Sequence, residues 1–191
     1  LSGLVNVTTT NFEDGTMAVY ISQHTLVEPA APPRPLPSNV DFANARAGGI
    51  DIKSGRLRGL FDAQLKIEGG TVGVSTVKGY KTMLDDLANG LRTQVNAIHR
   101  TSDDPLDISE RFFADVPIGD PQTGAVDFDL NPPIKADVTT ILAGHPSRPG
   151  DGSIALALSG MRDDPQGILG GKSFNSFYSE MISNLGREAQ F

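Results

Sequence analysis

The chain has 191 residues, a formal net charge of −7 at pH 7 and a sequence pI near 4.8. This length suits one main body with a core, and the acidic charge argues against nucleic acid or an anionic membrane surface as the main partner. The absence of cysteine excludes disulfide scaffolds, thiol catalysis, zinc ribbons and iron–sulfur sites.

No apolar run reaches the roughly 18 residues of a membrane-spanning helix. The chain opens on Leu1 and shows no basic segment followed by an apolar leader. We therefore take it as a segment of a longer protein. The 21 glycines and 13 prolines form no low-complexity run, so they indicate turns.

Alternating apolar residues in the first part of the chain predict β-strands over residues 5–9 and 17–21. Between these runs, Asp14 and Gly15 supply the positive φ angles that a tight hairpin turn needs. The pattern therefore predicts a β-hairpin, and residues 25–27 predict a third short strand.

The proline-rich residues 29–37 predict an extended connector, because proline cannot donate to a strand ladder. After the connector, residues 39–42 and 49–52 could add edge strands to the hairpin.

Three helices are predicted. Ser54 can cap a helix over about residues 56–67, and residues 69–74 interrupt the helical pattern as a loop or a short extended piece. A long amphipathic helix is expected over about 78–100 and a C-terminal one over about 173–188. The apolar stripes are Tyr80, Leu84, Leu87, Leu91, Val95 and Ile98 in the long helix, and Phe174, Phe177, Tyr178, Met181, Ile182 and Leu185 in the last one.

The region between these two helices is rich in loops. Residues 106–113 could hold a helical turn, residues 125–130 alternate as a strand, and residues 136–143 could form one or two helical turns. Residues 154–158 are ambiguous, because their alternation suggests a strand whereas their Ala and Leu content suggests a helix.

Histidines and nucleophile motifs give little chemistry. No metal-ligand spacing links His24, His99 and His145, and no Gly-x-Ser-x-Gly elbow occurs. We expect the imidazole of His99 to interact with the carbonyl end of the long helix.

Two partial motifs also fail. Gly171-Lys172-Ser173 lacks the opening glycine of a phosphate-binding loop, and a connector followed by an N-cap serine accounts for it better. The run from Asp127 to Asn131 begins like a calcium loop but lacks the later glycine and glutamate. No catalytic, cofactor-binding or metal-binding residue is therefore predicted.

The predicted fold class is α+β: a helical bundle of long amphipathic helices with an adjoining small antiparallel β-hairpin region. The expected domains are residues 1–53, rich in β-hairpin, and residues 54–191, helical with a short β/loop insertion at about 104–150. The alternative left open is that the two regions form one continuous globular unit.

Six short patterns occur together in chain order. They are the Asp-Gly hairpin turn, a Gly-x-Leu-x-Gly-Leu helix start at residues 55–60, a Leu-Ala helix that ends in Asn-x-x-His, a Phe-Phe pair, a Gly-Asp helix start, and a Phe-x-x-x-Tyr helix. The positions that carry them are Asp14, Gly15, Leu57, Gly59, Leu60, Leu87, Ala88, Asn96, His99, Phe112, Phe113, Asp151, Phe174 and Tyr178.

In this order the patterns resemble the central segment of the flagellar hook-associated protein 1 family, the first of the two junction proteins between hook and filament. The chain departs from the family in having no glycine soon after His99 and in carrying Gly152 where the family has asparagine. The resemblance implies that residues 154–161 are helical.

The resemblance implies a structural subunit of the bacterial flagellum, exported through the flagellar secretion apparatus and located outside the cell. It implies no cofactor, and it implies contacts with hook subunits and the second junction protein. It also implies an export chaperone that acts through terminal helices absent from this segment. Without those helices, the segment is expected to be monomeric.

The residues leave two other classes of function to consider. A small hydrolase would need a site assembled from scattered Asp, Ser and His residues, and nothing in the sequence supports one. An extracellular surface adhesin or carbohydrate-binding module is the alternative, because three strands beside a proline-rich loop are a common binding surface.

Overall fold

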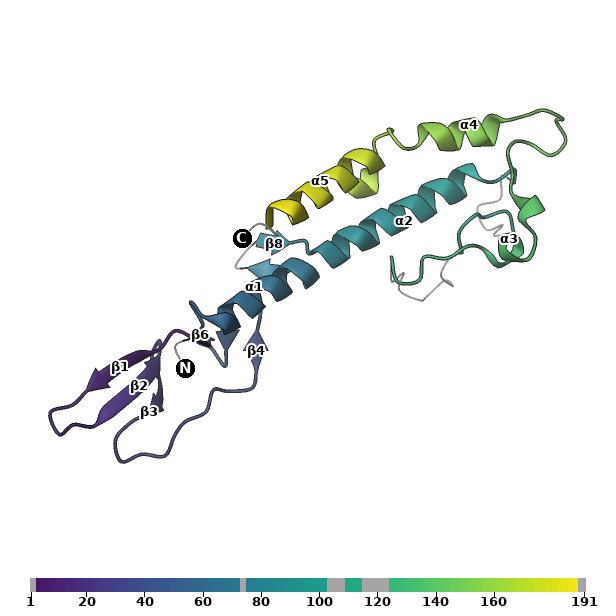
Figure 1. Cartoon of the computed structure of the whole chain (residues 1–191). Coiled ribbons are helices and arrows are strands. Elements are labelled where there is room, and N and C mark those ends of the chain that lie inside the picture. Colours follow the sequence, from purple (N-terminus) through teal and green to yellow (C-terminus); the bar gives the residue numbers. More distant parts are fainter. Residues whose placement is uncertain (1–2, 73–74, 103–108, 115–123, 189–191) are drawn as a thin grey trace. The chain divides into compact units, whose positions relative to one another are not determined.

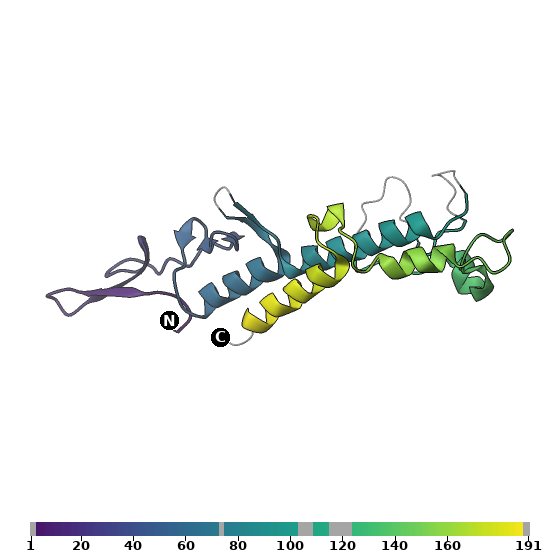
Figure 2. The ribbon, with the colours of Figure 1, turned by 90° about the horizontal axis from the view of Figure 1, so that it is seen from above.

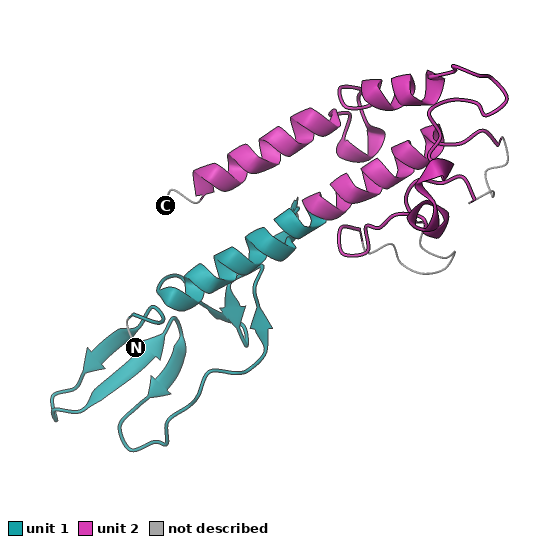
Figure 3. Ribbon diagram, turned by 45° about the vertical axis from the view of Figure 1, so that its right-hand side comes forward, with its two compact units in different colours: residues 1–82 teal, residues 83–191 magenta. Residues whose placement is uncertain are grey.

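The computed structural model describes residues 3–72, 75–102, 109–114 and 124–188. Figure 3 shows that the chain divides into two compact units, Leu1–Thr82 and Met83–Phe191. The boundary between the units falls inside the first turn of a helix. The domain boundary that the sequence suggested, after residue 53, stays a prediction.

Three antiparallel strands open the first unit and pair in the order β1-β2-β3 (Figure 1). In the turn between β1 and β2, the Phe12 N–H donates to the Thr16 carbonyl at 2.9 Å and the Gly15 N–H donates to the Phe12 carbonyl at 3.0 Å. Gly15 has the positive φ predicted for it, 81°, whereas Asp14, for which the same was predicted, does not have a positive φ. The hairpin and the third strand are thus confirmed. Their bounds are Thr8–Asn11, Met17–Ile21 and His24–Val27.

A second small sheet follows the proline-rich residues 29–37, which form neither helix nor strand, as expected. Its strands are β4 (Val40–Asp41), β5 (Arg46–Ala47) and β6 (Ile50–Asp51). The expectation that these residues would extend the hairpin sheet is wrong. Gly48 and Gly49, both at positive φ, reverse the chain at once, so the segment pairs with itself.

Helix α1 (Arg56–Glu68) begins one residue later than a Ser54 cap would place it. Its N-cap is Gly55, at φ 87°, and no side chain caps the helix. The first turn instead donates to the chain's opening segment, from the Arg56 N–H to Gly3 and from the Leu57 N–H to Leu4. A Cβ on Gly55 would lie 2.6 Å from the Leu4 carbonyl oxygen, so glycine lets the two segments meet.

The core of the first unit joins α1 to the strands. Phe61 of α1 is fully buried among Val5, Ile21, Ala45 and Ile52. The buried side of α1 therefore faces β-strands and loops of its own unit.

A two-stranded hairpin, β7 (Gly70–Val72) and β8 (Ser75–Val77), stands where a loop or a short extended piece was expected. It follows α1 directly. Residues 73–74 lie outside the described residues.

Helix α2 (Tyr80–Ile98) and helix α5 (Phe174–Glu188) confirm the two predicted amphipathic helices. They lie side by side in both Figure 1 and Figure 2. Side chains from both helices share a cluster in the second unit, and a Cβ on Gly90 would lie 3.1 Å from the Phe174 ring. The cluster consists of Leu169, Phe174 and Phe177, with Met83, Leu87, Leu91 and Met161 packed against them.

The remaining elements of the second unit are short: α3 (Pro132–Ala136), α4 (Ser153–Gly160) and 3₁₀ turns at Val138–Thr140 and Gly167–Leu169. Helix α4 confirms the helical reading of residues 154–161.

One local prediction in this unit fails, and another is confirmed in part. The strand expected over residues 125–130 is absent, because turns occupy 124–127 and only Leu130 pairs, in an isolated bridge with Phe113. Of the one or two helical turns expected over 136–143, one forms, as a 3₁₀ turn at Val138–Thr140. Asp137 is extended, separates this turn from α3 and accepts from the Thr139 N–H. The helical turn expected over 106–113 lies partly outside the described residues.

The predicted fold class is therefore wrong in its main part. The described residues form a small α+β structure with five helices of 5 to 19 residues and three small antiparallel sheets, and no bundle of long helices. The bundle was inferred from apolar stripes alone, yet α1 packs on strands and α4 leaves Leu156 74% exposed.

Candidate functional site

Helix α2 carries a second buried face beside the one that meets α5. It consists of Ala88, Arg92 and Asn96 of α2 and of His99, which directly follows the helix. These residues follow one another at spacings of four, four and three, and all four are buried. Three of these side chains are polar, so their hydrogen bonds decide what this face does.

Asn96 and His99 both bind the segment that contains the Phe-Phe pair. The Asn96 side chain donates to the Phe113 carbonyl at 3.0 Å and accepts the Phe113 N–H at 2.8 Å. The His99 ring lies edge-on to Phe112, with 5.2 Å between ring centroids.

The two ring nitrogens of His99 serve different segments. Nδ1 lies 2.7 Å from the Glu110 carbonyl oxygen, and Nε2 accepts the Leu142 N–H at 2.8 Å. These partners assign the proton to Nδ1. The expectation that His99 would interact with the carbonyl end of its own helix is wrong, because the imidazole bonds to two other segments instead.

Arg92 anchors the next part of the chain. Its side chain is 1% exposed and donates to the carbonyl oxygens of Gly124 and Asp127, both at 3.3 Å, and to the Asn89 side chain at 2.7 Å. It also lies 3.4 Å from the Asp127 carboxylate and 5.6 Å from the centre of the Phe128 ring. The guanidinium thus ties a turn to α2.

The contacts of Asn96 and His99 with Phe112 and Phe113, which we call the lock, hold two segments of the chain together. Both ring nitrogens of His99 and both ends of the Asn96 amide are engaged by backbone groups. A general base needs a lone pair directed toward a substrate, and neither side chain offers one here.

The other two histidines lie apart from this face. His145 is exposed, and its Nδ1 lies 2.8 Å from the Ser147 hydroxyl. His24 lies in β3, and its Nε2 is buried without a hydrogen-bond partner. Within the part of the chain that the structure describes, no group of three or more His, Asp or Glu residues could hold a metal ion.

His24 borders an open pocket of about 530 Å³ in the first unit, together with Ser22, Gly49, Asp51 and Lys53. The pocket has polar walls, and the unpartnered Nε2 of His24 is its least satisfied group.

Several carboxylates among the described residues accept hydrogen bonds from local turns. The Asp151 carboxylate accepts the His145 N–H at 2.8 Å and the Ser153 N–H at 2.9 Å, at the start of α4. These two bonds hold the pKa of Asp151 below its usual value. In the hairpin turn, the hydroxyl and the N–H of Thr16 likewise lower the pKa of Asp14.

The residues of the two rejected motifs have separate structural roles. Asp127 pairs with Arg92, whereas Asp129 pairs with Lys135, so the calcium-like run does not converge on one point. Lys172 pairs with Glu180, and the Ser173 hydroxyl accepts the Ser176 N–H, which is the helix cap that the sequence predicted.

Helix α5 has a second apolar edge that stays in solvent. Phe174, Phe177 and Met181 are buried, whereas the exposed fractions of Tyr178, Ile182 and Leu185 are 51%, 45% and 47%. These three residues, the α5 stripe, follow one another at spacings of four and three and so share one face. Contiguous exposed apolar surface of this kind marks interaction sites.

The structure brings together part of the set of positions predicted from the sequence. Asn96, His99, Phe112 and Phe113 meet at the lock, and Leu87 and Phe174 share the α2–α5 cluster. The others serve local structure: Asp14 and Gly15 in the hairpin turn, Leu57, Gly59 and Leu60 on α1, Ala88 on the buried face of α2, Asp151 just before α4, and Tyr178 on the α5 stripe.

Sequence reasoning missed Arg92, Glu110 and Asn131. The Glu110 carboxylate accepts the N–H and the hydroxyl of Thr101, and the Asn131 side chain donates to the Arg111 carbonyl at 2.8 Å. The signal in the sequence was the helical spacing of three polar residues, Arg92, Asn96 and His99, which indicates a buried polar face on α2.

Comparison with known proteins finds no matching family model, no similar curated protein and no similar solved structure. None of the helices in the described residues is both long and apolar enough to span a membrane.

Proposed function

We propose that the chain is a structural subunit of the bacterial flagellum at the hook–filament junction, which assembles by subunit packing without catalysis. The observation that carries this proposal is the lock: Asn96, His99, Phe112 and Phe113 are distant in sequence and bind one another. Two of the six patterns behind the resemblance, Asn-x-x-His and Phe-Phe, thus form a single structural unit. Their polar atoms bond to backbone, as a structural role requires.

The α5 stripe supplies a surface for packing. A residue such as Ile182, 45% exposed on an ordered helix, loses water contact when a neighbouring subunit covers it. We assign the stripe to contacts with neighbouring subunits of the junction, the hook subunits and the second junction protein. The subunit then acts outside the cell.

Deletion of the gene tests the proposal in the bacterium that carries it. The expected result is that hooks remain while filaments no longer grow, as seen by electron microscopy. A deletion strain with normal filaments would exclude the proposed role.

Complementation with variants of the stripe tests the surface. Ile182→Asp should restore a folded, exported protein but not filaments, because the carboxylate is tolerated in solvent and not in a packed contact. The matched control is Ser183→Asp, which adds the same charge at an exposed polar position one residue away and should restore filaments. Equal complementation by both variants would remove the stripe from the assembly surface.

The second candidate function is glycan binding by an extracellular adhesin, and the pocket beside His24 is the observation that favours it. A sugar hydroxyl could pair with the unpartnered Nε2. Retention on a panel of immobilised glycans that His24→Ala abolishes would support this function, and no retention would exclude it.

A further inference from the structure

The turn end of the first hairpin carries an exposed apolar side chain on an ordered support. Phe12 is 43% exposed, and its backbone N–H and carbonyl are both bonded across the turn. Asp14 fixes the turn further by accepting from the N–H and hydroxyl of Thr16, at 2.9 and 2.7 Å. We call residues 12–15 the hairpin tip. The tip therefore presents a phenyl ring in a set position at little cost in entropy.

An apolar pocket of about 610 Å³ lies at the other end of the same sheet. Its floor is the core of the first unit, at Val5 and Ile21, and its rim includes Leu4 and Leu60, which are 52% and 63% exposed. Among the described residues, the only charged side chain that lines it is that of Arg56, at the start of α1. The pocket is large enough for a phenyl ring, whose burial removes about 150–250 Å² from water.

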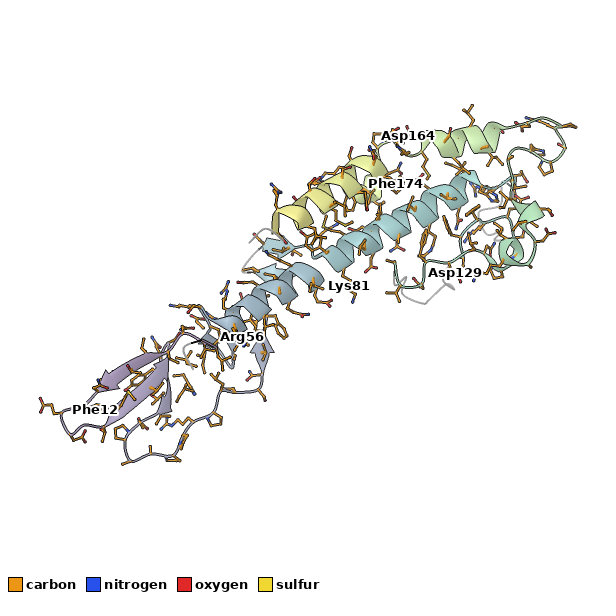
Figure 4. The ribbon with its side chains drawn as sticks, in the orientation of Figure 1. Phe12, Arg56, Lys81, Asp129, Asp164 and Phe174 are labelled. Carbon is orange, nitrogen blue, oxygen red and sulfur yellow. The ribbon has the colours of Figure 1, made fainter. Side chains whose placement is uncertain are left out.

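The chain cannot fill this pocket with its own tip. Strand β2 leaves the tip at Met17. The nearest pocket residue in the sheet is Leu26 of β3, beside Val19 and Tyr20, and the farthest is Ile21, so two to four residue steps, about 7–13 Å, hold the tip and the pocket apart. In Figure 4, Phe12 lies at the turn end of the hairpin and Arg56 lies at the start of α1. A tip that enters such a pocket must come from another molecule.

Charge favours a second copy of this chain as that molecule. The tip carries Glu13 and Asp14, and Asp14 is held ionised by its bonds to Thr16. Arg56 at the pocket has no ion-pair partner among the described residues. The acidic hairpin tip and the basic rim of the apolar pocket therefore attract each other, and this attraction guides their association and sets its orientation.

We propose that the hairpin tip of one copy enters the apolar pocket of the next, with Phe12 against the floor and Glu13 beside Arg56. The two surfaces lie on different parts of the unit, so the contact is heterologous and can repeat from copy to copy. This inference rests on the proposed structural role and names one contact by which copies would assemble. A single hairpin tip buries far less than the roughly 1,200 Å² of a stable interface, so the dilute chain stays monomeric and the contact forms at high local concentration.

Cysteine cross-linking tests the contact, because the natural chain has no cysteine and gives no background. Chains with Glu13→Cys are mixed at high concentration with tagged chains with Arg56→Cys and treated with a short bis-maleimide. The expected product is a mixed dimer, and the double variant should give a ladder of oligomers. The control pairs Glu13→Cys with Arg148→Cys, which places the second thiol on an exposed loop of the other unit. Equal yields from both mixtures would overturn the proposal.

A second variant distinguishes a specific contact through Phe12 from random cross-linking between colliding chains. Adding Phe12→Ala to the Glu13→Cys chain should lower the mixed-dimer yield about ten-fold, because the ring supplies most of the buried area. An unchanged yield would overturn the proposal. Phe12 is exposed, so its loss should leave the fold intact, which an unchanged circular dichroism spectrum would verify.

The cross-link also separates this inference from the proposed function. Cross-linking in a chain whose gene proves dispensable for filaments would leave the contact standing and remove the flagellar role. Loss of filaments on deletion, with no specific cross-link, would keep the role and remove the contact.

Discussion

The side-chain amide of Asn96 pairs with the backbone of Phe113 through two hydrogen bonds, of 3.0 and 2.8 Å, and so acts as a strand partner. On its other side, Phe113 forms a β-bridge with Leu130. A short segment is thereby held between a side chain of α2 and the isolated bridge at Leu130, and neither partner is close to it in sequence.

Replacing Asn96 by leucine tests this pairing. Asn96→Leu removes both bonds and leaves the N–H and carbonyl of Phe113 without these partners in a partly buried site, at a cost of about 2 kcal/mol. Hydrogen exchange of the Phe113 amide, followed by NMR, should accelerate by more than about ten-fold. Thr93→Ala, at an exposed position on the same helix, is the control and should leave the exchange rate unchanged.

His99 should be observed in one neutral tautomer, with its proton on Nδ1. The Glu110 carbonyl accepts that proton, and the Leu142 N–H requires a lone pair on Nε2. Long-range ¹H–¹⁵N correlation spectra of the ring distinguish the tautomers, and a proton on Nε2 would contradict the assignment.

Replacing His99 by phenylalanine tests how much its two hydrogen bonds contribute to stability. His99→Phe keeps the ring contact with Phe112 but loses both hydrogen bonds, and should lower the free energy of unfolding by about 2 kcal/mol. His145→Phe changes an exposed ring and should lower it far less. Equal losses in urea titrations would show that the bonds of His99 contribute nothing.

Arg92→Met tests the anchor of the neighbouring turn. The variant keeps a long apolar stem but leaves the Gly124 and Asp127 carbonyl oxygens without their donor, and should cost about 3 kcal/mol. The control is Arg162→Met, because Arg162 and its partner Asp163 are both 72% exposed and such pairs contribute little. Urea titration of both variants measures the difference.

The hydrogen bonds at the start of α4 should depend on pH, because they are accepted by the carboxylate of Asp151. Its pKa is lowered because its carboxylate accepts the N–H groups of His145 and Ser153. A group with a lower pKa in the folded chain stabilises that chain above its unfolded pKa, and the contribution disappears as the pH falls through the folded value. The amide resonances of His145 and Ser153 should therefore titrate together below about pH 4.

Asp151→Asn checks the origin of that titration. The neutral amide keeps an acceptor oxygen but has no charge to lose, so the shared titration should vanish. Asp163→Asn, at an exposed position, should leave it in place. Persistence of the titration in Asp151→Asn would assign it to another group.

Local elements could be predicted from the sequence wherever one pattern decided them. Asp14-Gly15 set the first hairpin, and the apolar stripes placed α2 and α5 within a few residues. The pairing of elements could not be predicted in the same way. An apolar stripe shows that a helix needs a partner, but α1 found its partner in strands, through Phe61.

For a similar reason, the sequence indicated some residues of the candidate site but not their partners. Asn96 and His99 stood out through the resemblance, yet their targets are backbone atoms of residues 110, 113 and 142, and backbone atoms leave no mark in a sequence. Arg92 was overlooked because a charged residue on an amphipathic helix is usually solvated. Here its guanidinium is enclosed by carbonyl oxygens and the Phe128 ring.

Two leucines of the apolar stripe on α2 differ in burial, so they test whether burial or apolar character alone determines the contribution to stability. Leu91 packs against the cluster that contains Phe174 and Phe177, whereas Leu84, two turns earlier in the same predicted stripe, is 44% exposed. Leu91→Asp should therefore place an unpaired carboxylate against the cluster and lower the free energy of unfolding by several kcal/mol. Leu84→Asp should cost well under about 1 kcal/mol, because its carboxylate stays in water. Circular dichroism at 222 nm during urea titration measures both, and similar midpoints for the two variants would show that the sequence stripe, rather than the observed burial, defines the packed face of α2.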